Sequence, residues 1–171
     1  MKKYVVAAVI AILVLVAGVA VYTSRGITSP NGTVALGNRS GNGSDVPFTK
    51  LASGINANVH AQANYVIDSQ EKLNSLWNLL PGAGPMPTID FEKNIVVALF
   101  AGEQPTTGYD LSVSGIEDSA SARTVHVVLN KPAPSCLTGQ IITQPYLVLE
   151  VSKTDLPLAH TDTETVTDCA Q

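Results

Sequence analysis

Residues 94–101 read NIVVALFA, and the uninterrupted apolar run that begins at Ile95 decides the fold. A run of this length with no polar face is typical of a strand that is covered on both sides. We therefore predict a central β-strand over residues 94–101. The segment YLVLEVS at residues 146–152 predicts another strand further along the chain.

Two half-buried strands are predicted between these segments. Apolar and polar residues alternate at 109–114 and again at 123–130, which is the period of a strand with one buried face. Residues 117–122 between them predict a turn. Upstream, the segment 58–67 indicates one more strand. Residues 81–91 are rich in proline and glycine and predict a loop.

One short amphipathic helix is predicted over residues 69–80. Asp68 is the expected N-cap, with Glu71 three residues later as in a capping box. Pro81 and Gly82 end the run. The apolar residues at helical spacing are Leu73, Leu76, Trp77 and Leu80, which we expect in the core.

The element order is therefore β-α-β-β-β-β. The links at residues 102–107 and 117–122 are too short for parallel crossovers, which need a dozen residues or more. We predict a mainly β domain with a minor α+β character, folded as a mostly antiparallel β-sandwich or a partly open barrel with one short helix.

The N-terminal segment, residues 1–25, is predicted to insert into a membrane. Lys2 and Lys3 precede an uncharged stretch that would rise about 28 Å as a helix, close to the thickness of the hydrocarbon core. It is either a retained signal anchor or a signal peptide cleaved after Ala20. The positive-inside rule places the N-terminus in the cytoplasm and the rest outside. The expected location is thus the cell membrane, single-pass, with a periplasmic or extracellular C-terminal domain that is secreted if cleavage occurs.

Residues 26–45 predict a flexible linker rich in glycine, serine and asparagine. As a coil it would span about 25 Å. Residues 46–171 then form the folded domain. The domain is more acidic than the chain's net charge of −4 indicates, because four of the ten basic residues precede it. Nucleic acid is an unlikely partner, since its recognition needs a basic face.

The two cysteines, Cys136 and Cys169, favour a disulfide, because the domain is expected outside the membrane. The alternative is that Cys136 is a catalytic nucleophile, which would need a nearby histidine. His60, His126 and His160 are scattered and do not have metal-ligand spacing. The chain also lacks the motifs of a phosphate loop or a serine nucleophile. We expect no metal, no cofactor, no small-molecule substrate and no enzymatic activity.

A further segment, GEQPTTGYDLSV at residues 102–113, joins two predicted strands. Pro105 presets φ for a turn and Gly108 can adopt a positive φ. Thr106 and Thr107 contribute hydroxyls that can bond the loop's own backbone. The segment is therefore either a tight turn and nothing more, or the tip of a loop that contacts another molecule.

From about residue 46 to residue 166 the chain resembles the PrcB C-terminal-like family, named for an accessory subunit of an exported bacterial protease complex. The resemblance is carried by residues 89–113 and 125–151. Members show an Asp-Phe pair before a hydrophobic strand, a Gly-x-x-Pro-Thr-x-Gly-Tyr loop and a Thr-x-Pro-Tyr motif. Here these motifs are Asp90-Phe91, Gly102 with Pro105 to Tyr109, and Thr143 to Tyr146. Many members carry a signal peptide or a lipid anchor, but this chain has no lipid-acceptor cysteine.

The same loop is also similar to the Asn-Pro-Thr-Thr-Gly-Phe/Tyr loop of chagasin-type inhibitors of papain-like cysteine proteases. The match covers Pro105 to Tyr109, with Gln104 where asparagine is usual. The two later loops of those inhibitors are absent.

These resemblances imply a non-catalytic, membrane-tethered module that binds an exported protein as an accessory or stabilising subunit. The kind of partner that they indicate is a protease. The loops at 102–109 and 132–143 are the expected contact surface. The alternatives are a chagasin-like inhibitor and a structural envelope domain without a protease partner. The residues predicted to bind the partner are Gln104, Pro105, Thr106, Thr107, Gly108, Tyr109, Thr143, Pro145 and Tyr146.

Overall fold

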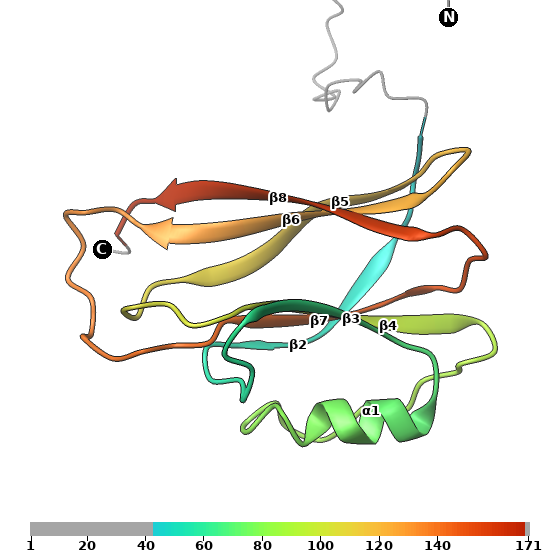
Figure 1. Ribbon diagram of the computed structural model, residues 1–171, viewed down its shortest axis with the longest axis horizontal. Helices are drawn as coiled ribbons and strands as arrows, with labels where there is room; N and C mark the ends of the chain where they lie inside the picture. Colours follow the sequence, from blue (N-terminus) through green and yellow to red (C-terminus); the bar gives the residue numbers. More distant parts are fainter. Residues whose placement is uncertain (1–42, 170–171) are drawn as a thin grey trace, which may run out of the picture. The chain divides into compact units, whose positions relative to one another are not determined.

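The computed structural model describes residues 43–169 (Figure 1). The predicted membrane segment and residues 26–42 of the predicted linker lie outside this range. Among the described residues, no helix is long and apolar enough to cross a membrane.

Two four-stranded sheets and one helix make up the fold. The first sheet has the order β1-β5-β6-β8, and the second has the order β2-β7-β4-β3. The strands of the first sheet are β1 (Ser44–Asp45), β5 (Asp110–Asp118), β6 (Arg123–Pro132) and β8 (Leu158–Thr167). Those of the second are β2 (Phe48–Gly54), β7 (Tyr146–Ser152), β4 (Asn94–Ala101) and β3 (Gln62–Ile67). The helix α1 (Gln70–Trp77) lies on the outer face of the second sheet, so the domain has three layers (Figure 1).

The strand β4 explains why this arrangement forms. Its residues Ile95, Val97 and Leu99 belong to the core between the two sheets. The alternate residues Val96 and Phe100 belong to a second core beneath the helix. A strand that serves two cores must be apolar on both faces, and the run from Ile95 to Ala101 meets this requirement. The predicted central strand is confirmed, with the bounds expected from the sequence.

The core beneath the helix also depends on α1. Leu73 and Leu76 are buried against the second sheet, and Trp77 packs beside them. The helix is shorter than predicted and begins after Ser69, whose side chain accepts a hydrogen bond from the Lys72 amide. Asp68 was the expected N-cap, but its carboxylate instead lies 2.8 Å from the Lys72 ammonium.

The prediction of a mainly β, mostly antiparallel fold is confirmed in its coarse form. Within residues 43–169 the two sheets do not close into a barrel, and β6 with β8 is the one pair of named strands that runs parallel. The strands β2 and β8 were not predicted. The predicted strand at 58–67 is present from Gln62 onward.

Two predicted boundaries change. A bulge between Val113 and Gly115 lets β5 continue to Asp118, so Glu117 and Asp118 belong to the strand and the turn covers residues 119–122 only. At the other boundary, the last two residues of the predicted linker form β1, which pairs with β5.

Candidate functional site

The loop between β4 and β5 begins at Gly102, where the backbone needs glycine. Gly102 has a φ of +71°, and a Cβ at this position would lie 2.7 Å from the backbone nitrogen of Gln62. Directly after it, the Glu103 amide donates to the backbone oxygen of His60 at 3.0 Å. His60 Nδ1 also lies 2.7 Å from Glu103 Oε1. The start of the loop is thus fixed against the segment that leads into β3.

A two-residue ladder joins this loop to the connection between β6 and β7. The Gln104 amide donates to the Thr143 oxygen at 2.8 Å, and the Thr143 amide donates to the Gln104 oxygen at 2.9 Å. The Thr143 hydroxyl, which is fully buried, donates to the backbone oxygen of Thr106 at 2.9 Å. Thr143 therefore holds the loop at Gln104 and at Thr106.

The tip of the loop is held by the same connection. The Thr107 amide donates to the Gly139 oxygen at 3.0 Å, and the Gly139 amide donates to Thr107 Oγ1 at 2.7 Å. Gly108 follows with a φ of +93° and packs close to Pro132. The Thr107 hydroxyl thus bonds the neighbouring loop, whereas its own loop was the expected partner.

In the motif from Thr143 to Tyr146, only Gln144 is partly exposed to solvent. Thr143, Pro145 and Tyr146 are all buried, although the sequence indicated them as partner contacts. Burial raises the pKa of the Tyr146 phenol. Tyr146 packs against Gly54, where a Cβ would meet its ring at 2.8 Å. These side chains therefore support the loops from within the fold.

The loop between β4 and β5 and the connection between β6 and β7 both have exposed residues. Pro105 and Gly108 are exposed at the tip of the first loop, and Gln104, Thr106 and Tyr109 are half-buried. On the second loop, Leu137 is fully exposed, and Ile141 and Ile142 are 60 % and 63 % exposed. We call this surface, made of residues 104–109 and 137–142, the two-loop surface. The three aliphatic side chains were not singled out from the sequence.

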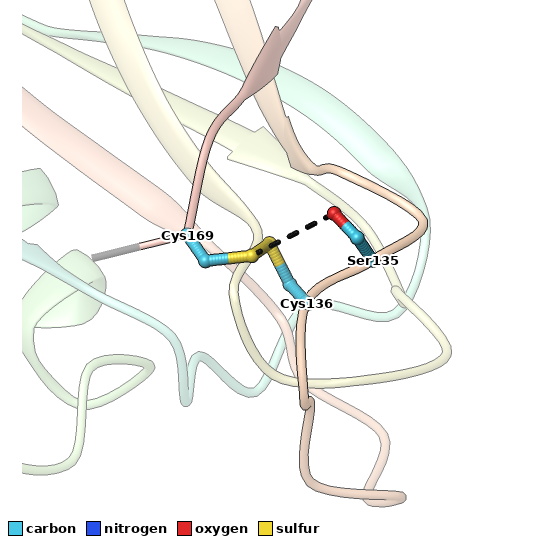
Figure 2. Close-up of a disulfide and its surroundings, with 3 residues drawn as sticks. All are labelled: Ser135, Cys136 and Cys169. Carbon is cyan, nitrogen blue, oxygen red and sulfur yellow. Dashed lines mark hydrogen bonds between the residues drawn. A yellow bond between two sulfur atoms is a disulfide. The ribbon is translucent and has the colours of Figure 1, made fainter. Parts of the chain in front are cut away.

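A disulfide fixes the second loop to the end of β8. Cys136 and Cys169 are bonded, with Cα atoms 5.3 Å apart, and this confirms the predicted pair. Figure 2 shows Ser135 beside the disulfide, with its hydroxyl 4.0 Å from the Cys169 sulfur. Because Cys136 is in a disulfide here, it is no free thiol nucleophile.

The three histidines have different polar partners. His60 contacts Glu103, and His160 Nδ1 lies 3.0 Å from Asp162. His126 Nδ1 lies 2.8 Å from the Thr161 hydroxyl. Within residues 43–169, no group of three histidine, cysteine or acidic residues has a geometry that could hold a metal ion.

With this geometry in place, comparison with protein families gives one match. Residues 95–152 match the family described as PrcB C-terminal. This segment of the chain is similar to the PrcB C-terminal family. No curated protein matches the chain, and no solved structure matches it.

The PrcB C-terminal match supports the resemblance expected from the loop motifs, over the residues that it covers. It runs from β4 to the end of β7, so it contains both loops of the two-loop surface and the buried residues that hold them. It leaves out α1 and β8, which flank it in the chain.

Proposed function

We propose that this chain is a non-catalytic, membrane-tethered binding module outside the cytoplasm. It docks through the two-loop surface on an exported protease, as an accessory or stabilising subunit. The domain carries no small-molecule substrate or cofactor in this role.

The observation that carries the proposal is the exposure of three aliphatic side chains on a restrained loop. Leu137, Ile141 and Ile142 face solvent, whereas exposed aliphatic residues usually occur singly on a protein surface. The loop that bears them is held by Thr107, by Gln104 and by the disulfide. A restrained loop loses little conformational freedom on binding, and this favours affinity.

The match to the PrcB C-terminal family supports a protease as the partner. The family takes its name from an accessory subunit of an exported protease complex, and the matched residues include the two-loop surface. The predicted export of the domain would place it in the same compartment as such a protease.

The absence of catalysis is part of the proposal. Cys136 is bonded to Cys169, and the Thr107 hydroxyl accepts a hydrogen bond from the Gly139 amide. Neither group is left as a nucleophile with a base beside it, which is the arrangement that nucleophilic catalysis needs.

The test is photo-crosslinking of the full-length chain in the cells that produce it. A photoreactive residue is placed at position 141 of the two-loop surface or, as a control, at position 86, where Met86 is exposed in the loop after α1. We expect a protease to be crosslinked from position 141 and not from position 86. We also expect the purified protease to lose activity or stability when the chain is left out.

The proposal fails if both positions capture the same proteins, or if no protease is among those captured from position 141. A double variant, Ile141→Ser with Ile142→Ser, gives a second check. It should weaken the complex in the full-length chain, whereas Met86→Ser should leave it unchanged.

The alternative is a chagasin-like inhibitor, and the exposure of Pro105 and Gly108 at the loop tip favours it. An inhibitor of this kind would lower papain activity in a direct assay with the full-length chain. An accessory subunit would leave papain unaffected.

A further inference from the structure

The two sheets are open to solvent along one edge. At the other edge the chain itself crosses from β1 in the first sheet to β2 in the second (Figure 1). At the open edge, β8 ends the first sheet and β3 ends the second. Two adjoining cavities of about 470 Å³ and 410 Å³ lie between these strands and share Gln62, Asn64, Leu99 and Asp162. We call them together the edge groove.

The backbone edge of β3 forms one wall of the edge groove. All five consecutive residues from Gln62 to Val66 line the first cavity. Side chains alternate between the faces of a strand, so an unbroken run along a cavity indicates that the strand's edge faces it. The edge strands β3 and β8 each pair on one side only. Such edges carry unpaired N–H and C=O groups that can pair with another strand.

The floor of the edge groove is apolar. It is formed by residues of the core between the sheets, among them Val97, Leu99, Val125 and Val127. Apolar surface of this kind favours a ligand that carries apolar side chains.

The rim on the β8 side is polar and charged. In the parallel register, His160 lies beside Val125, Asp162 beside Val127 and Glu164 beside Leu129. These three residues therefore point toward the same gap as the aliphatic residues of β6. Glu164 is paired with Lys131, but Asp162 contacts only His160 among the charged groups described.

We propose that the edge groove binds an extended segment of a partner polypeptide by β-strand addition. The segment pairs its backbone with the free edge of β3, places alternate apolar side chains on the floor and directs a lysine or arginine to Asp162. Backbone pairing supplies affinity in this mode, and the alternate side chains supply specificity. The edge groove belongs to the sandwich edge and does not depend on which protein docks on the two-loop surface.

The charges on β8 explain why the edge groove favours a segment with a basic residue over a purely apolar segment. Charged residues that point inward at a sheet edge oppose indiscriminate pairing, because an apolar segment would remove water from them without supplying a new polar partner. A segment with one basic residue satisfies Asp162 while it covers the apolar floor. The acidic balance of the domain acts in the same direction.

The test uses a displayed library of random decapeptides, selected on the immobilised full-length chain in detergent. We expect the selected peptides to alternate apolar residues and to carry at least one basic residue. Their affinities are then measured by fluorescence anisotropy. Asn64→Trp, which places a bulky side chain in the edge groove, should abolish binding. Asp162→Asn should weaken binding roughly two- to fivefold, the range of an exposed ion pair.

The controls separate the edge groove from the rest of the surface. Asp155→Asn removes one exposed carboxylate outside the edge groove and should leave the affinity unchanged. Circular dichroism of each variant checks that the fold is kept. The proposal is overturned if no alternating peptide is selected, or if Asn64→Trp still binds. It is also overturned if sedimentation shows that a second copy of the chain occupies the edge groove and Asn64→Trp makes the chain monomeric.

Discussion

The hydroxyl of Thr143 donates a hydrogen bond to the backbone oxygen of Thr106, 37 residues earlier in the chain, at 2.9 Å. Thr143 is fully buried, so this hydroxyl has no access to water. Replacing it by valine would leave the Thr106 oxygen without this donor. We expect Thr143→Val to lower the free energy of unfolding by about 1–2 kcal/mol, measured by urea denaturation.

Thr143→Ser is the matched control, because it keeps the hydroxyl and removes only a methyl group. It should lose about 1 kcal/mol, the value of one buried methyl group, and keep the two-loop surface in place. Equal crosslinking from position 141 in Thr143→Val and in wild type would show that this hydrogen bond does not position the loops.

A second prediction concerns Asp118 and Arg123, which close the β5–β6 hairpin. Arg123 is 3 % exposed, and its Nε and Nη2 atoms donate to the two Asp118 oxygens at 2.6 and 2.7 Å. These hydrogen bonds lower the pKa of the Asp118 carboxyl below its usual 3.8. A carboxyl whose pKa is lower in the folded state stabilises the fold above its unfolded pKa. This stability is lost as the pH falls below about 4 and through the folded pKa.

The measurement is urea denaturation at pH 7, 4 and 3. Asp118→Asn should cost on the order of 1–2 kcal/mol at pH 7, because it removes a charge-assisted pair, and the difference from wild type should shrink at pH 3. Asp155→Asn, which changes an exposed carboxyl without such a partner, should have the same free energy of unfolding as wild type in these measurements. A constant difference between Asp118→Asn and wild type would contradict the assignment.

The third prediction compares two glycines. Gly102→Ala should destabilise the domain by 2 kcal/mol or more, on the order of the cost of strain and overpacking together, since the new methyl group would meet the chain at residues 60–62. Gly115 in β5 has no atom within 4 Å of a Cβ at its position, and its φ is not positive. Gly115→Ala should therefore be neutral or slightly stabilising. Thermal denaturation of both variants checks the contrast, and similar losses of stability would refute it.

The fourth prediction concerns the disulfide, which closes a separation of 33 residues. In the chain-entropy account such a bond stabilises by about 3–4 kcal/mol. Reductant should lower the melting temperature of the wild-type chain to that of a Cys136→Ser, Cys169→Ser double variant. The double variant itself should not respond to reductant.

Hydrogen exchange locates the effect of that reduction. Because β8 contacts the rest of the fold mainly through its pairing with β6, its amides should exchange faster once the disulfide is open. The amides of β4 should keep their protection. Faster exchange throughout the domain would mean that the disulfide supports the cores and not the end of β8.

The sequence predicts the centre of this fold better than its edges. The strands β4 and β7 have the predicted bounds because each contains a run of buried apolar residues, at 95–100 and at 146–149, and this pattern has few alternative structures. The strand β8 reads LAHTDTETVT, and beyond Leu158 its residues are exposed on both faces. A strand without an apolar face has no hydrophobic period to detect. In β2 only Ala52 is buried, so the same reason applies.

The sequence likewise predicts only part of the candidate site. The motifs place residues 104–109 and the Thr143–Tyr146 segment in one candidate site, and in the structure Thr143 contacts Gln104 and Thr106. They do not tell which side chains face solvent. In an irregular loop no period relates sequence to side-chain direction, so the exposure of Leu137, Ile141 and Ile142 emerges only from the folded chain.

The strand β8 also bears on how this domain can change over evolutionary time. It lies outside the PrcB C-terminal match, and after Leu158 it adds backbone pairing to β6 without giving the cores a buried side chain. Substitutions along it need to preserve only strand propensity and the cystine at its end. Its sequence can therefore diverge between lineages while both cores stay the same, and the residues that face the edge groove can be retuned to new peptides.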